Sequence, residues 1–277
     1  MITAQDINKL RQQTGAGMMD CKKALTEGEG DFDKAIEILR KKGQKVSAAR
    51  ADRATTEGIV LTKTNDTHNY GVILALSCET DFVAKNDSFQ QLGQTILEAA
   101  FMHKPDTLEN LLLLAVEDGV CIQEKITALV GKIGEKVTIS AYTTLSNETV
   151  VPYVHLGKKL GVLVGLQGSH GPQVIEAGKD VAMQIAALNP LAVDKDDIDT
   201  VIVERELAIA REQAQNEGKP EIMLDKIAQG RLNKFFKENT LLNQLFVKNN
   251  ELTVAQHLAN IAPSLTVVAF KRVSIVS

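Results

Sequence analysis

Apolar residues recur at helical spacing through the first forty residues, in three stretches separated by turn residues. These apolar positions are Ile7 and Leu10, then Met18, Cys21, Ala24 and Leu25, and finally Phe32, Ala35, Ile36 and Leu39. The run from Thr14 to Gly17 separates the first two stretches, and Asp31 is the expected N-cap of the third. The pattern predicts a three-helix bundle over residues 1–40. Residues 41–56 are basic and carry Val46 as their one large apolar side chain, so we interpret them as a partly helical linker.

The period of the pattern changes to that of strands from Glu57 onward. Residues 58–64 and 70–78 are expected to pair as a hairpin, because the polar turn 65–69 joins them. A helix is expected beyond Asp81, with one apolar face made by Phe89, Leu92, Ile96, Leu97 and Ala100. A second helical stretch from Leu108 through Val130 and a closing strand over 136–145 complete the unit. Such a mixture, with a hairpin in place of strict strand–helix alternation, predicts an α+β core unit over 57–146.

A second copy of this unit is indicated by an internal repeat. YGVILALS at 70–77 matches LGVLVGLQ at 160–167, which is an offset of 90 residues, and LGQTILEAA at 92–100 falls near AGKDVAMQIAAL at 177–188. The expected strands of the second unit, residues 147–277, include 149–154 and the closing strand 265–276. Pro152 predicts that the first of these lies at a sheet edge, because proline cannot donate a ladder hydrogen bond.

The second unit contains an insertion that the first lacks, at about residues 197–235. Its apolar positions are Val203, Leu207, Ala210 and Ala214, then Leu224, Ile227, Ala228 and Phe235. The turn Gly218-Lys219-Pro220 separates the two groups, so we expect a hairpin of two antiparallel helices. Its single narrow apolar seam and many charges favour a hairpin that projects from the body.

Composition narrows the possible functions. The chain has 277 residues, 44% hydrophobic and 24% charged, which is typical of a globular protein with real cores. A net charge of −4, 4% aromatic residues and no Trp argue against direct nucleic-acid binding. Asp6 lies where the apolar core of a signal peptide would be, and no apolar run is long enough for a membrane span, so we expect a cytoplasmic protein without a membrane partner.

The residues that enzymes use are scarce. No phosphate-binding loop is present, the five histidines show no paired metal spacing, and Cys21, Cys78 and Cys121 are an odd number at wide spacing. We therefore expect no catalytic activity, no metal site and no cofactor. One alternative stays open, because Lys22 and Lys23 could activate the Cys21 thiol, although its place on an apolar stripe favours a core residue.

The segment from Cys78 to Lys85 places a large aromatic residue between charged neighbours, just after a strand. Phe82 could fold back into the core, as aromatic residues usually do. It could instead be an exposed anchor on a loop, the kind of residue that dominates protein–protein affinity. The pattern alone leaves both interpretations open.

Two motifs give the chain a resemblance to a known family. LRQQTGAGMMDCKKAL at 10–25 closely resembles the N-terminal signature of bacterial translation elongation factor Ts, and ETDFVAK at 79–85 resembles its second signature. The resemblance implies a ubiquitin-associated-like three-helix bundle, a duplicated α+β core and a helical-hairpin (coiled-coil) insertion. A binding adaptor, suggested by the small bundle alone, finds no support in the remaining chain.

The function that this resemblance implies is guanine-nucleotide exchange on elongation factor Tu, the GTPase that carries aminoacyl-tRNA to the ribosome. Such a factor catalyses no covalent change and promotes GDP release by disturbing the magnesium and phosphate sites of its partner. A higher-order complex through the helical hairpin is a further expectation. The residues carried over for the magnesium-displacing contact are Thr80, Asp81, Phe82 and Val83, and those for other contacts are Arg11, Met18, Met19, Ile133, Gly134 and His155.

One pair of these residues has an open alternative, and two nearby pairs depart from the family pattern. Met18 and Met19 could equally be core residues. Ala75 and Ser77 stand where the family often has an acid and an asparagine, so we expect different bracing of the strand before the second signature. Lys158 and Lys159 stand where a glycine and an arginine are common, next to His155.

Overall fold

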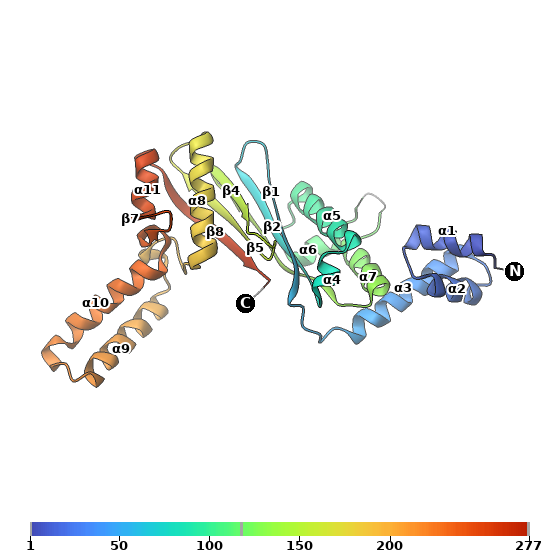
Figure 1. Cartoon of the computed structure of the whole chain (residues 1–277), viewed down its shortest axis with the longest axis horizontal. Coiled ribbons are helices and arrows are strands. Elements are labelled where there is room, and N and C mark those ends of the chain that lie inside the picture. The colour runs from blue at the N-terminus through green and yellow to red at the C-terminus, as the bar shows by residue number, and fades with distance from the viewer. Residues whose placement is uncertain (1, 117–118, 276–277) are drawn as a thin grey trace.

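The computed structural model describes residues 2–116 and 119–275. A helical bundle lies at one end of an elongated molecule, two sheets with their helices form the middle, and a helical hairpin projects near the other end (Figure 1). The α+β class and the N-terminal helical bundle are thus as the sequence predicts.

The N-terminal bundle is built from three helices whose caps are encoded locally. They are α1 (Ala4–Thr14), α2 (Met18–Glu27) and α3 (Phe32–Ala49). The Thr3 side chain accepts from the Asp6 backbone N–H, and the Asp31 carboxylate accepts from the N–H groups of the first turn of α3, which satisfies donors that no helix can pair internally. The bundle core consists of Leu10, Cys21, Ala24, Leu25 and Ala35, all fully buried or nearly so. Burial of Cys21 favours its interpretation as a core residue over that of a reactive thiol.

Helix α3 continues to Ala49, far into the range that we interpret as a partly helical linker. The reason is tertiary: α3 crosses α7 (Ile122–Ile133), and two glycines meet at the crossing. A Cβ on Gly131 would lie 2.8 Å from the Cα of Gly43, so only glycine allows this approach. Val46 packs against the core of the first unit. The basic segment therefore docks the bundle onto the core.

The first core unit is a three-stranded antiparallel sheet with helices on one face. The strands β1 (Glu57–Thr64), β2 (Tyr70–Cys78) and β3 (Val137–Ser146) are ordered β1-β2-β3. Its helices are α4 (Asp81–Ala84), α5 (Asp87–His103), α6 (Leu108–Leu113) and α7.

The expectation of one continuous helical stretch over 108–130 is wrong. Helix α6 ends at Leu113, and Leu114 has an extended backbone. Gly119 adopts a positive φ of 74°, and α7 then begins after Cys121, whose N–H donates to the Glu124 carboxylate. Residues 117 and 118, which fall in the expected stretch, lie outside the described residues.

The second unit repeats the first. Its strands β4 (Thr149–Val154), β5 (Leu160–Gln167) and β8 (Thr266–Ser274) are ordered β4-β5-β8, and α8 (Pro172–Leu188) packs on β4 and β5. The internal repeat is confirmed in the backbone, because the register shifts at Ala75/Leu76 and at Gly165/Leu166, the same offset of 90. Strand β4 lies at the edge, as Pro152 predicts. The expected last residue of the closing strand, 276, lies outside the described residues.

The two sheets pack face to face, which explains the unbroken apolar run of β2. Every residue of β2 is buried, because α5 covers one face and the second sheet covers the other. The residues between the sheets are Val60, Ile73, Ala75, Leu145, Val150, Leu163 and Val273. The order of layers in the middle of the molecule is therefore helices, sheet, sheet, helix (Figure 1).

The insertion is the expected helical hairpin, formed by α9 (Thr200–Asn216) and α10 (Glu221–Asn239). Its buried seam is made by Ala210, Ala214, Leu224, Ala228 and Leu232. Helix α10 runs a few residues beyond the expected end near 235. Several short elements around the hairpin were not predicted: the 3₁₀ turns Lys195–Asp197 and Leu241–Asn243, β6 (Leu245–Phe246), β7 (Asn249–Thr253) and α11 (Val254–Ile261).

Candidate functional site

The segment after β2 forms a single helical turn that exposes Phe82. Thr80 is the N-cap of α4, and its Oγ1 accepts from the Val83 N–H at 3.4 Å. Val83 and Ala84 are buried in the core of the first unit, whereas Phe82 is 82% exposed. The interpretation of Phe82 as a core residue is therefore wrong, and its role as an interface anchor stays a prediction.

A charged pair lies beside the exposed ring on the same turn. Lys85 Nζ is 2.7 Å from Asp81 Oδ2, one helical turn away. The hydrogen bond from Lys85 lowers the pKa of the Asp81 carboxyl, and the same bond raises the pKa of Lys85. Both groups are therefore charged at neutral pH, so Phe82 stands beside a polar rim.

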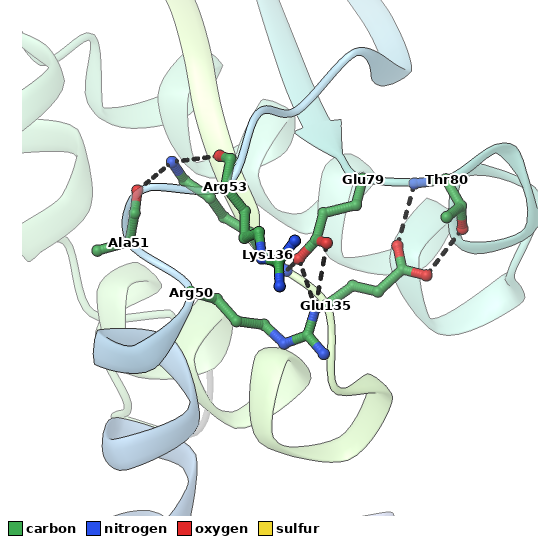
Figure 2. Close-up of polar contacts among 7 residues, drawn as sticks. All are labelled: Arg50, Ala51, Arg53, Glu79, Thr80, Glu135 and Lys136. Atoms are coloured by element: carbon green, nitrogen blue, oxygen red, sulfur yellow. Dashed lines mark hydrogen bonds and ion pairs between the residues drawn. The ribbon is translucent and has the colours of Figure 1, made fainter.

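A reciprocal set of hydrogen bonds holds the base of this turn, and we call it the Glu79–Glu135 clasp. The Glu79 carboxylate accepts from the Lys136 backbone N–H at 2.7 Å. The Glu135 carboxylate accepts from the Thr80 backbone N–H at 3.0 Å and from Thr80 Oγ1 at 2.8 Å (Figure 2). Each loop thus supplies a carboxylate to a backbone donor of the other, which ties the β2–α4 loop to the α7–β3 loop.

The clasp also holds the segment that follows the bundle. Arg50 Nη1 donates to Glu79 Oε1 at 2.9 Å, and Lys136 Nζ donates to the carbonyl oxygens of Ala51 at 2.6 Å and Arg53 at 3.0 Å (Figure 2). The pKa of the Glu79 carboxyl is lowered, first by the Lys136 N–H and then by Arg50. Three chain segments that are distant in sequence therefore meet directly behind the Phe82 turn.

Ile133 and Gly134, two of the expected contact residues, lie at this junction. Ile133 ends α7, and Gly134 has a φ of 78°, which turns the chain so that Glu135 can reach Thr80. No neighbouring atom lies within 4 Å of the position of a Cβ on Gly134, so this face of the turn is open. The structure therefore brings these residues together with Thr80 and its helical turn.

His155 lies on the β4–β5 turn, which faces the same side of the core. Its Nδ1 is 2.8 Å from the Tyr153 hydroxyl, and the ring is exposed. The turn is attached to β1, because the Val60 N–H donates to the Lys158 carbonyl and Lys159 Nζ is 2.6 Å from the Glu57 carboxylate.

A groove runs between this turn and α4, with Asp81 and Lys85 on one side and Gly157 and Lys158 on the other. Leu156, next to His155, is 91% exposed and was not predicted. A leucine inside a polar, glycine-containing turn is the signal that could have identified it. The groove is thus flanked by two elements that each carry an exposed apolar side chain.

The remaining expected contacts lie on the bundle. Met18 and Met19 are 52% and 64% exposed, so the alternative of core residues is wrong for both, and Arg11 is exposed as well. They occupy α1 and α2 at one end of the molecule, whereas Phe82 belongs to the core (Figure 1). The structure therefore presents two separate surfaces.

The strand that leads to the Phe82 turn is held by a side-chain contact with its neighbour. The Ser77 hydroxyl is 2.6 Å from the Ser140 hydroxyl, which braces β2 against β3 just before the second signature. Within residues 2–116 and 119–275, no group of three or more His, Cys, Asp or Glu side chains is placed to hold a metal ion. No helix among these residues is long and apolar enough to cross a membrane.

Comparisons with known proteins point to one family. A sequence model of the family described as Elongation factor TS matches residues 79–276. The chain is 67% identical over 272 residues to Elongation factor Ts of Amoebophilus asiaticus, covering 98% of both chains. It is 55% identical over 274 residues to that of Cytophaga hutchinsonii, covering 99% of both, and 48% identical over 275 residues to that of Christiangramia forsetii, covering 99% of this chain and 98% of the relative.

Proposed function

The chain belongs to the elongation factor Ts family of translation elongation factors, and from this membership we propose that it is the guanine-nucleotide exchange factor for elongation factor Tu. In this role it works in the cytoplasm, binds the GTPase, promotes release of GDP and performs no covalent chemistry. The observation that carries the proposal is the exposed Phe82 on a turn whose base is fixed by the clasp.

Exchange requires that the factor and the nucleotide weaken each other's binding to the GTPase. Because this coupling is reciprocal, a residue that serves exchange must bind the nucleotide-free partner more strongly than the GDP-bound one. A large apolar ring fits this role if it fills a gap that opens when the magnesium and phosphate sites of the partner are disturbed. Phe82 would supply that ring, and its neighbours Thr80, Asp81 and Val83 would belong to the same contact.

Preorganisation supports the assignment. An exposed aromatic side chain on a mobile loop would lose conformational entropy on binding, which would reduce its contribution to affinity. Phe82 instead lies two residues after the N-cap Thr80 and directly before the buried Val83 and Ala84. It can therefore bind with little further ordering of the backbone.

The other exposed residues suggest how far the interface extends. The groove between α4 and the β4–β5 turn would place His155 and Leu156 within the same contact as Phe82. Arg11, Met18 and Met19 would form a second contact on the bundle, held at a set distance by the packing of α3 on α7. The projecting hairpin offers a further surface for a higher-order complex.

The direct test is Phe82→Ala in an assay of fluorescent GDP released from elongation factor Tu. Truncation of an aromatic anchor at the centre of an interface typically costs about 2 kcal/mol or more, so stimulated release should fall by at least about tenfold. The melting temperature of the free protein should change little, because the ring is exposed.

Met102→Ala is a matched control for this test. Met102 is also an exposed apolar residue of the first unit, but it lies at the opposite end of α5 from α4. It should leave release unchanged. Normal release by a folded Phe82→Ala variant would refute the assignment of Phe82, and failure of the unmodified protein to speed release would refute the proposed function.

A further inference from the structure

The orientation of Phe82 cannot be a property of its own helical turn. Helix α4 contains only four residues, and an isolated turn of helix is unstable because its nucleus fixes many dihedral angles for very few hydrogen bonds. The direction in which Phe82 projects must therefore come from contacts outside α4. Such contacts hold both ends of the turn: Val83 and Ala84 are buried and Gln90 Nε2 donates to the Ala84 carbonyl, while the clasp holds the N-terminal end.

Glu135 is the member of the clasp that acts closest to Phe82. Both of its carboxylate oxygens bind the same residue, Thr80, one at the backbone N–H and one at the hydroxyl. Thr80 is the N-cap of α4 and precedes Phe82 by two residues. A bidentate contact to one residue fixes its orientation as well as its position, because rotation about a single hydrogen bond is no longer possible.

Glu79 connects the loop that carries Glu135 to the segment that follows the bundle. Its carboxylate binds both the Lys136 N–H, which follows Glu135, and the Arg50 guanidinium, which follows α3. The loop that carries Glu135 is therefore itself held, and the segment that leads from the bundle is held with it.

We propose that Glu135 is a positioning residue that sets the direction in which Phe82 projects. The effect on Phe82 in the free protein stands by itself, and only its consequence for exchange rests on the proposed function. The two parts can therefore be tested separately.

The first test uses the absence of tryptophan from the chain. Phe82→Trp introduces a single indole whose fluorescence anisotropy reports local motion at position 82 without any partner. In this background, Glu135→Ala should lower the anisotropy and increase quenching by acrylamide, because α4 loses its fixed base. Glu135→Gln should restore most of both signals, since its amide oxygen can accept from the Thr80 N–H and its amide N–H can donate to Thr80 Oγ1.

Glu148→Ala is the matched control in the same background. The Glu148 carboxylate also accepts from a backbone N–H, that of Gly168 at 2.8 Å, but in the second unit. It should leave the indole signals unchanged. If Glu135→Ala does not fold, Glu135→Asp carries the test, because its side chain is one methylene shorter and cannot keep both bonds to Thr80, while the N-cap bond from the Val83 N–H to Thr80 Oγ1 is left in place. Unchanged anisotropy in a folded variant that lacks the contact would overturn the proposal.

The second test is a double-mutant cycle in the exchange assay. Loss of two hydrogen bonds to a charged group should reduce stimulated GDP release by about three- to tenfold in Glu135→Ala. The same change in the Phe82→Ala background should have less than about a twofold effect, because a positioning residue acts through the side chain it positions. Additive effects would overturn the positioning role. If Phe82→Ala itself leaves release unchanged, the proposed function of Phe82 fails, while the anisotropy result still decides the positioning.

Discussion

The Glu79 carboxylate makes the stability of the fold depend on pH. Its donors are the Lys136 backbone N–H and the Arg50 guanidinium, and Arg53 adds a favourable charge nearby. Together they lower its pKa in the folded protein. The unfolded chain therefore binds a proton at Glu79 more readily than the folded chain does, and the contact stabilises the fold only while the carboxylate is charged.

Comparison of the unmodified protein with Glu79→Gln tests this pH dependence. At about pH 7 the unmodified protein should have the larger free energy of unfolding. As the pH falls below the ordinary glutamate pKa of about 4.3 and through the lowered value, this difference should shrink, because protonation removes the same charge that the substitution removes. Urea titrations followed by circular dichroism measure it. Glu204→Gln, on the exposed side of α9, controls for loss of a charge alone, and a difference that does not depend on pH would contradict the role of the Glu79 charge.

At the scale of residues, the sequence predicts which segment carries the candidate site but not which contacts hold it. In ETDFVAK at 79–85 an aromatic residue follows two acids just after a strand, which indicates an exposed ring, yet the same sequence is compatible with a buried one. Exposure of Phe82 is decided by its neighbours Val83 and Ala84, which take the inward positions of the turn. Glu135 lies far along the chain from Thr80, and no local pattern indicates that they meet.

At the scale of elements, the crossing of α3 and α7 shows how a small side chain determines an arrangement. Gly43 and Gly131 let the helices approach so closely that the backbones touch. The bundle is attached to the core at this crossing, and Lys132 nearby fills the space beside Gly15 of the α1–α2 turn. The distance between the bundle surface and the Phe82 surface therefore depends on glycine, which has no Cβ, at both of these positions.

Substitution of a helical glycine should have opposite effects at two positions. Gly131→Ala places a Cβ 2.8 Å from the Gly43 Cα, so the helices must separate, and the free energy of unfolding should fall by about 1–3 kcal/mol. Gly230→Ala, in α10, has no neighbouring atom within 4 Å of its new Cβ and should raise stability by about 0.5–1 kcal/mol. Thermal unfolding measures both. Equal effects at the two sites would contradict the close crossing.

The sequence predicts the elements that depend on a local pattern and misses those that depend on tertiary contacts. The duplicated strands and the hairpin follow from periodicity, because alternation and helical spacing are local properties. The extension of α3 to Ala49 does not, because the segment lacks an apolar stripe and is stabilised by contact with α7. The short elements from Leu245 to Ile261 are likewise missed, since β6 spans two residues, β7 five and α11 eight, and runs of this length are too short for periodicity to assign on its own.

At the scale of the whole molecule, the hairpin is joined to the core by a narrow base. The Leu191 N–H donates to the Asn239 carbonyl, and the Leu241 N–H donates to the Ala192 carbonyl, so the chain enters and leaves at adjacent positions. Beyond this base, α9 and α10 pack on each other and project away from both sheets (Figure 1). Exposed apolar residues such as Val201 and Ile222 lie on this projection, where the fold does not require them.

Replacement of residues 200–238 by a short Gly-Ser loop tests whether the hairpin serves assembly. The core should keep its cooperative unfolding, because both buried clusters between the sheets and their helices are left intact and the base ladder can still form. Sedimentation of the complex with elongation factor Tu should then show a smaller assembly than with the full chain. Ile222→Ser keeps the hairpin but changes an exposed residue at its tip, so it separates a contact through the tip from a contact along the length of the hairpin. An unfolded core would show that the hairpin is part of the folding unit, and an assembly of unchanged size would assign the higher-order contact to another surface.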